Sequence, residues 1–277
     1  MKPIKTIGLQ NAMPKNKNAE LAKETLEIIR NKKYTSRNGE VIDISNSIDF
    51  SIKNTVLYKN DIPGLIRSKT NAVLEVVNET TAQAAVRLQN LGKTNIVALN
   101  FAAARNPGGG FLSGAVAQEE DLCRCSALYA CIKSKPIFYN ENILCDNAYY
   151  TDNIIYSPDV PFIRNEYNLL LEKPFKLSII TSPAPNVNAM DFLDEDVLLK
   201  TLSSRARKIL QVASNHGHTS LILGAWGCGA FGNNPSMVAN VFLNALRDIS
   251  VFEHVCFPVY DIRENQPVFN TFKQILG

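Results

Sequence analysis

The chain has 277 residues, a length that favours one large domain or a domain with an appendage. It is 45% hydrophobic and 20% charged, as is usual for a globular protein, and its net charge of +3 lacks the basic excess needed to bind nucleic acid by bulk charge. No stretch approaches the roughly 20 apolar residues of a membrane helix, and the N-terminus shows no apolar run like that of a signal peptide. We therefore expect a cytoplasmic protein with reduced thiols and with neither a membrane nor nucleic acid as a direct partner.

The first quarter of the chain shows no regular alternation of strands and helices. Residues 1–18 are polar and rich in Lys and Asn, and we expect an extended start there. Residues 19–32 carry apolar side chains at helical spacing, and residues 40–44 are typical of a short strand after an Asn-Gly turn. Residues 45–70 show no clear pattern and are expected to be irregular.

From about residue 71 the pattern becomes regular, and strands alternate with helices. The expected strands are 73–77, 95–101, 177–182, 219–225 and 254–260. The expected helices are 82–91, 118–133, 194–215, 235–248 and 266–276. Residues 134–176 contain scattered prolines and no periodicity, so we expect an irregular surface segment there, including YSPDVPFIR at 156–164. The alternation predicts an α/β fold with a mostly parallel sheet covered by helices on both faces.

Cysteines and histidines give only weak signals for a metal. Cys123, Cys125 and Cys131 lack the paired spacing of zinc ligands, and on a helix they would not share a face. We expect them to be small core side chains. His216 and His218 flank a glycine at the end of a predicted helix, where the helix dipole favours histidine, and a structural role is preferred there. No metal site is predicted.

Two glycine-rich segments each follow a predicted strand directly. NPGGG at 106–110 is followed within ten residues by the carboxylates of Glu119 and Glu120, and GCGAFG occupies 227–232. Because the carboxyl ends of parallel strands meet at one edge of a sheet, both segments should lie at that edge. Their backbone amides could together hold a diphosphate. The first segment is equally compatible with a tight turn before a helix whose first turn carries acids.

The second segment matches the G-x-G-x-x-G fingerprint of dinucleotide-binding domains. That fingerprint expects an acidic residue about 20 residues further on, at the end of the next strand. Here Asp261 lies 34 residues after Gly227, and only 45 residues remain after Gly232. The P-loop pattern is absent, because Ala115 follows Gly114 where a lysine would be needed. A nicotinamide-dependent dehydrogenase therefore remains only an alternative enzyme class.

NPGGG followed by QEE at 118–120 resembles the signature of the bacterial-type poly(ADP-ribose) glycohydrolases, a branch of the macrodomain fold. Further blocks similar to that family, in family order, are VVNETT at 76–81, LNFAAARNPGGG at 99–110, QEEDLCRCSALY at 118–129, YSPDVPFIR at 156–164, TSPAPN at 181–186 and LGAWGCGAFGNNP at 223–235. The resemblance implies a macrodomain-like catalytic core at 71–277, in which a mixed, mostly parallel sheet lies between helices. Residues 1–70 would form a small N-terminal helical cap packed on that core.

The resemblance implies a glycosidase that hydrolyses the ribose–ribose O-glycosidic bonds of poly(ADP-ribose), with no cofactor and no metal. Glu120 matches the catalytic second glutamate of the family motif, and Glu119 matches the neighbour that positions the ribose. Phe231 matches the residue that packs against the ligand's ribose. The residues implied to bind ADP-ribose are Asn106, Pro107, Gly108, Gly109, Gly110, Gln118, Gly227, Cys228, Gly229, Ala230, Phe231 and Gly232.

The expected partners are poly(ADP-ribose) as substrate, ADP-ribose as product, and ADP-ribosylated proteins. We expect a monomer that trims the polymer from its end, because in this family the N-terminal cap blocks internal entry. The alternative from another functional class is a module that binds ADP-ribose without cleaving it; a hydrolase of a different ADP-ribosyl linkage is a second alternative. The QEE pair favours the enzyme, since a binding module has no need of two glutamates beside the glycine loop.

Overall fold

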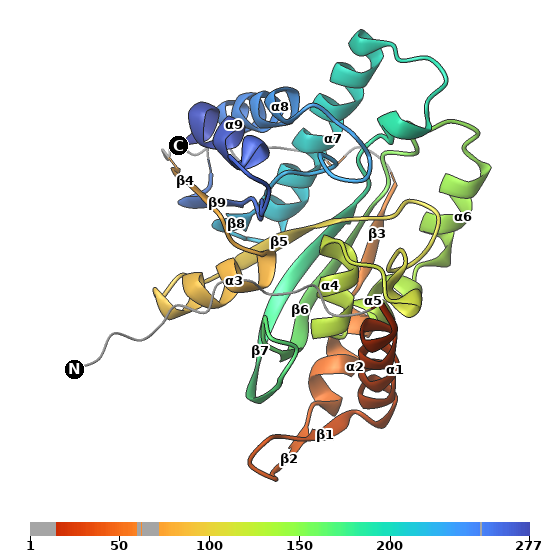
Figure 1. Ribbon diagram of the computed structural model, residues 1–277, viewed down its shortest axis with the longest axis vertical. Helices are drawn as coiled ribbons and strands as arrows, with labels where there is room; N and C mark the ends of the chain where they lie inside the picture. Colours follow the sequence, from red (N-terminus) through yellow and green to blue (C-terminus); the bar gives the residue numbers. More distant parts are fainter. Residues whose placement is uncertain (1–14, 60–61, 63–71, 250) are drawn as a thin grey trace.

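The computed structural model describes residues 15–59, 62, 72–249 and 251–277. Figure 1 shows a large sheet with groups of helices packed against it and a small two-stranded ribbon at one end. Two parts of the sequence predictions lie outside the described residues. They are residues 1–14 of the expected extended start, and residues 60–61 and 63–70 of the expected irregular segment. No helix in the described ranges combines the length and the apolar character needed to cross a membrane.

The elements follow one another along the chain as their residue bounds show. The strands are β1 (Lys33–Thr35), β2 (Val41–Asp43), β3 (Val56–Tyr58), β4 (Val73–Val77), β5 (Ile96–Phe101), β6 (Ile154–Arg164), β7 (Leu170–Ser182), β8 (Ser220–Ile222) and β9 (His254–Pro258). The helices are α1 (Lys15–Asn31), α2 (Ser45–Lys53), α3 (Thr81–Asn90), α4 (Gln118–Cys125), α5 (Leu128–Lys133), α6 (Pro136–Leu144), α7 (Glu195–Asn215), α8 (Pro235–Asp248) and α9 (Pro267–Leu276), with 3₁₀ turns η1 (Phe111–Ser113) and η2 (Val187–Ala189).

The large sheet has seven strands in the order β3-β6-β7-β5-β8-β9-β4. The neighbours β7, β5, β8, β9 and β4 pair in parallel, whereas β6 pairs antiparallel with both β3 and β7. The predicted mostly parallel sheet between helices is therefore confirmed. All five predicted strands are present, although β4 is a half-exposed edge strand and not the buried strand that its apolar sequence suggests.

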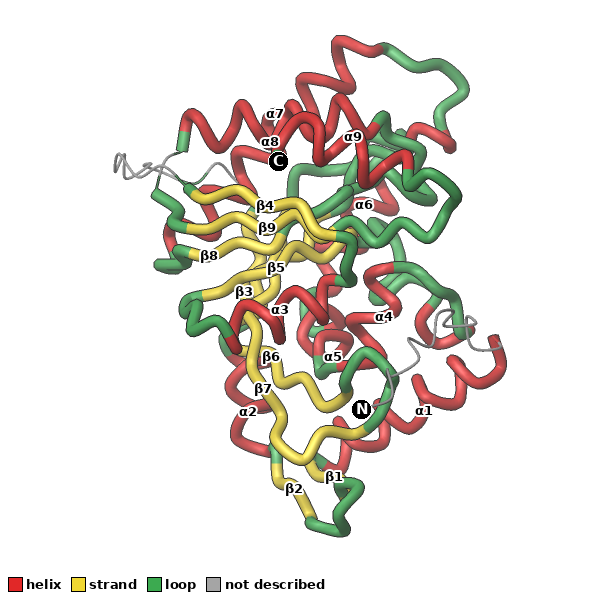
Figure 2. The backbone as a smooth tube through the Cα atoms, turned by 60° about the vertical axis from the view of Figure 1, so that its left-hand side comes forward, coloured by secondary structure: helices red, strands yellow, loops and turns green. Residues whose placement is uncertain are grey.

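Each face of the sheet carries its own hydrophobic core. Figure 2 shows helices on both sides of the sheet. Side chains alternate along β5, so that Ile96 and Ala98 join one core while Val97 and Leu99 join the other. Helices α3 to α6 contribute to the first core, and α7, α8 and α9 contribute to the second. Burial on both faces explains why the central strands have almost continuous apolar sequences.

The segment 134–176 is not the irregular surface excursion that its prolines suggest. It forms α6, β6 and the first part of β7, and β6 is buried along most of its length. A bulge between Ser157 and Val160, with Asp159 at φ 48°, interrupts the pairing with β7. Proline lacks the N–H that a regular ladder needs, so strands accept it at such irregularities. The prediction was wrong because the bulge made a strand sequence look like a loop.

The predicted helix 118–133 is two helices, α4 and α5, separated at Ser126. This residue adopts extended dihedrals (φ −147°, ψ 177°) and forms an isolated bridge with Phe162 of β6. Its hydroxyl donates to the carbonyl of Leu122 at 2.7 Å and accepts from the amide of Leu128 at 3.2 Å. Ser126 therefore binds the end of α4 and the start of α5.

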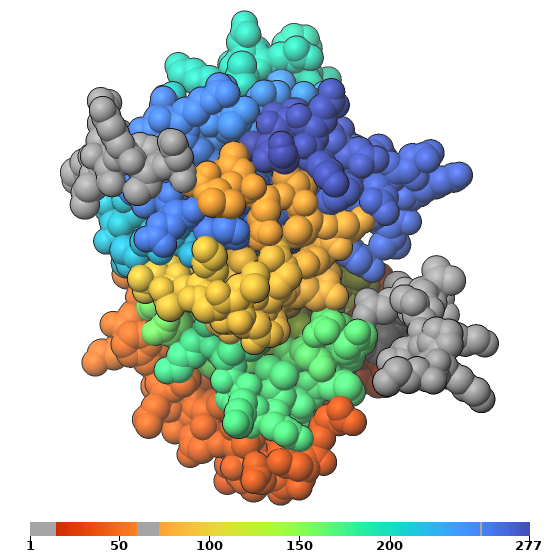
Figure 3. Space-filling model, turned by 90° about the vertical axis from the view of Figure 1, so that its left-hand side faces the viewer, coloured from red at the N-terminus to blue at the C-terminus, as the bar shows by residue number. Residues whose placement is uncertain are grey.

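The N-terminal segment is more regular than predicted and contributes to the large sheet. Helix α2 and strand β3 occupy part of the region expected to be irregular, and β3 is an edge strand of the large sheet. Helix α1 is tied to the core by Thr25, whose hydroxyl donates to the carbonyl of Arg124, and by an ion pair between Glu24 and Arg164. Figure 3 shows the orange part of this segment below the green β6–β7 hairpin. Tyr34 of β1 donates to the carbonyl of Leu171 in β7.

The two histidines after α7 have a structural role, but for a different reason from the predicted one. His216 stacks on Tyr156 with ring centroids 3.6 Å apart, and His218 bonds to the hydroxyl of Tyr156 and the carbonyl of Asn95. Burial lowers the pKa of both imidazoles, so they pack as neutral rings and are not held as cations by the helix dipole. Cys123, Cys125 and Cys131 lie buried in one hydrophobic core, as predicted.

Candidate functional site

Two neighbouring parallel strands deliver the two glycine segments to the same edge of the sheet. Strand β5 pairs with β8, with Ile96 opposite Ser220, and the segments at 106–110 and 227–232 both follow the carboxyl ends of these strands. This is the edge at which open α/β sheets bind ligands. The prediction that both segments lie at one edge of the sheet is confirmed.

In the first segment, glycine at position 109 makes room for two carboxylates. Gly108 and Gly109 have φ of +70° and +56°, in the left-handed region that favours glycine. A Cβ atom on Gly109 would collide with the Oε1 atom of Glu120 and would lie 3.3 Å from the Oε2 atom of Glu119. Both carboxylates therefore converge on the space above Gly109.

The amides of the first segment hold acceptors of the protein itself. The amide of Gly110 donates to Oε1 of Glu120 at 2.8 Å, and the amide of Gly109 donates to the carbonyl of Asn106 at 3.0 Å. Asn106 is exposed, and Pro107 is partly buried beside it. These two amides are thus occupied by acceptors of the protein itself, and the loop fixes a carboxylate in place.

Glu119 is buried, with 3% of its surface exposed, and accepts two hydrogen bonds. Its Oε2 atom accepts from the amide of Ala103 at 2.8 Å, and its Oε1 atom accepts from the side-chain amide of Asn100 at 3.1 Å. Burial raises the pKa of Glu119 to about 8, and the nearby charge of Glu120 acts in the same direction, against the lowering effect of the hydrogen bonds. Glu119 thus carries a proton at neutral pH.

Gln118 joins the start of α4 to the end of β5. Its Oε1 atom accepts from the amide of Phe101 at 2.9 Å, and its Nε2 atom donates to the carbonyl of Leu99 at 2.7 Å and to the hydroxyl of Thr81 at 3.1 Å. Both the oxygen and the nitrogen of the Gln118 side-chain amide are therefore hydrogen-bonded to other parts of the protein. These bonds determine where the two carboxylates stand relative to the sheet.

The second segment is built so that its middle is open. Gly227 and Gly232 have φ of +73° and +71°, and the buried side chain of Asn233 donates to the carbonyl of Gly227 and to that of Pro185. A Cβ atom on Gly229 would meet no atom within 4 Å. The amides of residues 229–231 donate to no acceptor in the described part of the chain. Three consecutive free amides of this kind can receive an anion.

The other residues of the second segment have distinct surroundings. Ala230 is exposed, and its carbonyl accepts from the side chain of Asn188. The thiol of Cys228 points inward to the carbonyl of Trp226, and burial raises its pKa to about 12. Cys228 can therefore contribute backbone atoms to a ligand but not a reactive thiolate.

An aromatic residue not predicted from the sequence lies between the two segments. The ring of Tyr150 lies 6.2 Å from that of Phe231, and the guanidinium of Arg105, which follows β5, lies 5.5 Å from the Tyr150 centroid. Tyr150 has φ of +63°, which is uncommon for a residue with a side chain. Tyr150 thus contacts both Arg105, which directly precedes the first segment, and Phe231 of the second segment.

A buried arginine holds the chain that carries Tyr150. Arg205 of α7 is fully buried and donates to Asp152 at 2.8 Å, to the carbonyl of Pro183 at 2.6 Å and to the carbonyl of Tyr149 at 2.9 Å. Its guanidinium thus ties the residues on both sides of Tyr150 to the end of β7. Such a fixed, fork-shaped set of donors is a property of arginine that lysine lacks.

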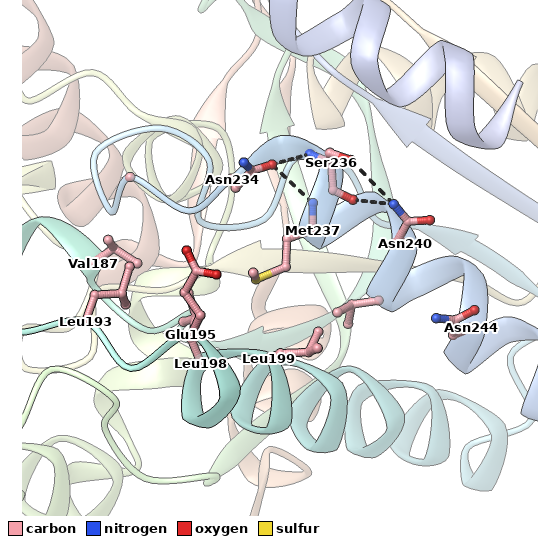
Figure 4. A pocket seen from close by; sticks show the side chains of 12 residues that line it. Val187, Leu193, Glu195, Leu198, Leu199, Asn234, Ser236, Met237, Asn240 and Asn244 are labelled. Atoms are coloured by element: carbon pink, nitrogen blue, oxygen red, sulfur yellow. Dashed lines mark hydrogen bonds between the residues drawn. The ribbon is translucent and has the colours of Figure 1, made fainter.

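A groove of about 540 Å³ adjoins the second segment on its outer side (Figure 4). It includes Gly232 and Asn234 and runs between α7 and α8. Neither Glu119 nor Glu120 lines it. No group of three or more His, Cys, Asp or Glu side chains in the described residues is arranged to hold a metal ion.

Comparison with known proteins identifies the family. A family model described as the microbial-type PARG catalytic domain matches residues 22–165. The chain belongs to this family, the microbial-type poly(ADP-ribose) glycohydrolases. The matched range contains both glutamates and the first glycine segment. Members of this family are glycosidases that hydrolyse poly(ADP-ribose). A comparison with curated proteins finds no match.

Solved structures agree with the family. Poly(ADP-ribose) glycohydrolase from Thermomonospora curvata is 37% identical with a TM-score of 0.86, and the match covers 94% of this chain and 100% of that one. The T. curvata enzyme bound to the inhibitor ADP-HPD gives the same identity and TM-score, over 94% of this chain and 99% of that one. The Deinococcus radiodurans enzyme in complex with ADP-ribose is 38% identical with a TM-score of 0.75, over 84% of this chain and 98% of that one. The fold of this chain is therefore that of these glycohydrolases.

Sequence reasoning missed three residues that build the site. Asn100 could have been noticed as a lone amide in an otherwise apolar strand that ends at the site. Tyr150 and Arg205 gave no local signal, since each acts through a partner far away in sequence.

Proposed function

We propose that Glu120 is the acid and base with which this glycohydrolase cleaves the ribose–ribose bonds of its polymer. The observation that carries the proposal is the convergence of both carboxylates above Gly109, with Glu120 held by the amide of Gly110 at 2.8 Å. A misplacement of about 1 Å can cost a catalytic group roughly 10²-fold in rate, so it must be held firmly. The hydrogen bond from the amide of Gly110 holds the carboxylate of Glu120 in this way, and the glycine at position 109 leaves room for it.

The substrate's diphosphate would bind the free amides of residues 229–231. Phe231 and Tyr150 would then enclose the ribose next to that diphosphate, with Arg105 behind the tyrosine ring. The distal ribose would lie over residues 106–110, within reach of Glu119 and Glu120. Glu119, which accepts from Ala103 and is buried, would hold the ribose hydroxyls in position.

The reaction would pass through an oxocarbenium-like transition state. As the bond between the anomeric carbon and the leaving ribose oxygen breaks, Glu120 gives its proton to that oxygen. The bound diphosphate, being anionic, stabilises the positive charge on the anomeric carbon. Water then attacks that carbon, and the carboxylate of Glu120 takes the proton that the water loses. Glu120 is thereby returned to its starting state.

The geometry favours a mechanism in which one carboxyl is first the acid and then the base. It is less suited to a mechanism in which two carboxyls act from opposite sides of the sugar. Enzymes that use a separate acid and base place them on two faces of the sugar, several ångströms apart. Here Glu119 and Glu120 are adjacent in α4 and approach the same point above Gly109. The second carboxyl therefore serves to orient the sugar.

We also propose that the enzyme acts from the end of the polymer, as a monomer in the cytoplasm. Helix α1 lies against the 3₁₀ turn η1, which follows the first segment, so closely that a Cβ atom on Gly114 at the end of that turn would collide with the carbonyl of Lys15. Such packing supports a site closed on one side, where a terminal unit fits and an internal unit does not. All six cysteines are free thiols, in keeping with a reducing compartment. Early release of long oligomers would contradict the end-acting mode.

The decisive experiment measures ADP-ribose release from purified poly(ADP-ribose) by the parent and by Glu120→Gln. We expect release by the parent and a loss of about 10² or more in the variant, as is usual for an acid–base group. Glu253→Gln, which changes an exposed glutamate before β9 in the same way, is the matched control and should retain full activity. Binding of ADP-ribose by both proteins without any release would indicate the alternative, a module that binds without cleaving.

A further inference from the structure

Helix α1 packs against η1, the turn that follows the first glycine segment, and against α4. Figure 1 shows α1 beside α4. The turn η1 ends at Gly114, which has φ of +78°. A Cβ atom on Gly114 would collide with the carbonyl of Lys15 and would lie 3.0 Å from the amide nitrogen of Ala19. The N-terminal part of α1 therefore limits where the loop between the first segment and α4 can lie.

A second contact joins the middle of α1 to the end of α4. The fully buried hydroxyl of Thr25 donates to the carbonyl of Arg124 at 2.8 Å and accepts from the Nε atom of Arg164 at 3.4 Å. Arg124 lies in the last turn of α4, where carbonyls have no partner within the helix. Because a buried carbonyl needs a donor, Thr25 supplies the hydrogen bond that this helix end lacks.

The side chain of Arg124 extends this connection to Glu120. Its Nη1 atom donates to the carbonyl of Ala115 at 2.7 Å. The amide of Ala115 donates to the carbonyl of Gly110 at 3.1 Å, and the amide of Gly110 donates to Oε1 of Glu120 at 2.8 Å. A series of hydrogen bonds thus joins Thr25 of α1 to the carboxylate of Glu120.

This series determines where the carboxylate of Glu120 lies relative to its own helix. The backbone of Glu120 belongs to α4, whereas its carboxylate is held by Gly110 of the preceding loop. The position of the carboxylate therefore depends on the distance between that loop and α4. Arg124 spans this distance from α4 to Ala115, and α1 holds Arg124 through Thr25. Loss of the bond from Thr25 would thus loosen the restraint on the carboxylate.

We propose that Thr25 is a positioning residue for the glycohydrolase reaction, acting through Arg124 and the loop at 110–115 on the carboxylate of Glu120. The inference rests on the proposed function, because it requires Glu120 to be the acid and base. It gives α1 a role beyond closing one side of the site. A helix that only closed the site would affect how polymer binds, whereas a helix that positions Glu120 affects the rate of cleavage after binding.

The second glycine segment is not part of this series. Residues 227–232 follow β8, and the hydrogen bonds between Thr25 and Glu120 do not involve them. Binding of ADP-ribose through the free amides of residues 229–231 should therefore not depend on Thr25. Loss of the Thr25 hydroxyl should lower kcat and leave KM nearly unchanged.

The test compares three variants in steady-state hydrolysis of poly(ADP-ribose), well below the melting temperature of each protein. Thr25→Val keeps the shape of the side chain and removes its hydroxyl, and Thr25→Ser keeps the hydroxyl. Thr55→Val is the matched control. Thr55 is also buried in the N-terminal segment, and its hydroxyl donates to the carbonyl of Ser51 at 2.7 Å and meets the hydroxyl of Ser157 at 3.4 Å. Titration with ADP-ribose gives the fraction of each protein that can bind, and kcat is normalised to that fraction.

We expect Thr25→Val to lower kcat about tenfold, which is less than the roughly 10²-fold that a misplacement of about 1 Å can cost. Its KM and its ADP-ribose binding should stay the same. Thr25→Ser should restore kcat nearly to the parent value, and Thr55→Val should lower the melting temperature without lowering kcat.

Three results would overturn the inference. One is an equal kcat for Thr25→Val and Thr55→Val, the second is a Thr25→Ser protein as slow as Thr25→Val, and the third is a change in Thr25→Val that is confined to KM. A failure of the proposed function would appear differently, as a Glu120→Gln protein that releases ADP-ribose as fast as the parent.

Discussion

The two glycine segments lie side by side, yet their backbones do opposite things. In the first, the amides of Gly109 and Gly110 are taken by Asn106 and by Glu120, and side chains fill the space above the glycines. In the second, the amides of residues 229–231 are free in the described structure, and the space above Gly229 is empty. One segment fixes the chemical groups, and the other leaves room for a ligand.

The difference shows that a run of glycines does not by itself indicate what a loop binds. In the first segment glycine is required because carboxylates of the same protein occupy the place of a Cβ atom. In the second segment the glycines at the two ends, Gly227 and Gly232, turn the chain at positive φ, and the amides of residues 229–231 between them donate to no acceptor among the described residues. The same residue type thus serves two separate purposes at one sheet edge.

The largest effect on activity should come from placing a methyl group in the first segment, residues 106–110, which we call the crowded segment. The second segment, residues 227–232, is the open segment. Gly109→Ala introduces a Cβ atom where Glu120 lies and costs roughly 1–2 kcal/mol for the left-handed backbone. We expect kcat to fall about 10²-fold, since a displaced acid–base group loses its contribution. Steady-state hydrolysis of poly(ADP-ribose) measures this.

The matched substitution in the open segment is Gly229→Ala. Its methyl group meets no protein atom within 4 Å, so folding and kcat should be preserved and only KM should change. If both variants lose kcat equally, the contrast between a crowded and an open segment is wrong. Melting temperatures of the two proteins exclude a trivial loss of fold.

A smaller effect on activity is expected from a substitution of Arg205, which holds the chain beside Tyr150 and lies outside the open segment. Arg205→Lys keeps the charge but cannot serve Asp152, Pro183 and Tyr149 together. Tyr150 would then lose its fixed place beside Phe231, and we expect KM to rise roughly tenfold, about 1.4 kcal/mol, with a smaller change in kcat.

Arg207→Lys is the control for this change, because Arg207 is an exposed residue of the same helix. Its ion pair with Asp248 lies at the surface and should contribute little. A fall in kcat with no change in KM for Arg205→Lys would contradict a role in holding the ligand. Titration of ADP-ribose below the melting temperature of each protein separates weaker binding from unfolding.

The sequence predicted those parts of the molecule that depend on local pattern. The glycine segments, both glutamates and the central strands could be recognised because neighbouring residues determine them. Strand β6 could not, since its bulge at residues 157–160 hides the strand pattern and only pairing with β7 reveals it. The role of Gln118 was also beyond prediction, because its amide meets backbone groups of β5 that only the folded chain brings near.

Long-range contacts explain the remaining differences. Tyr150 meets Phe231, and Arg205 meets the carbonyl of Tyr149, across wide separations in sequence. Strand β3 joins the large sheet although its surroundings in the sequence show no alternation of strands and helices. In each case the energy comes from tertiary packing and hydrogen bonds, which override weak local preferences.

The last prediction concerns the pH dependence of the stability of the ligand-free protein. The folded-state pKa of Glu119 is about 8, whereas its ordinary value is 4.5. Between these values the folded protein binds a proton that the unfolded chain has lost, so stability is greatest below pH 4.5 and falls as the pH rises to about 8. The loss from this group should be on the order of a few kcal/mol, since one pKa unit corresponds to about 1.4 kcal/mol.

Glu119→Gln should remove this part of the pH dependence. The neutral amide imitates the protonated carboxyl, and Asn100, whose Oδ1 atom has no partner among the described residues, can turn its amide over to accept from the new NH₂ group. We expect the variant to melt at a higher temperature than the parent at pH 8 and at a similar temperature at pH 5. Glu253→Gln, at the surface, should follow the parent at both pH values. An unchanged pH dependence in Glu119→Gln would mean that the folded protein does not raise the pKa of Glu119.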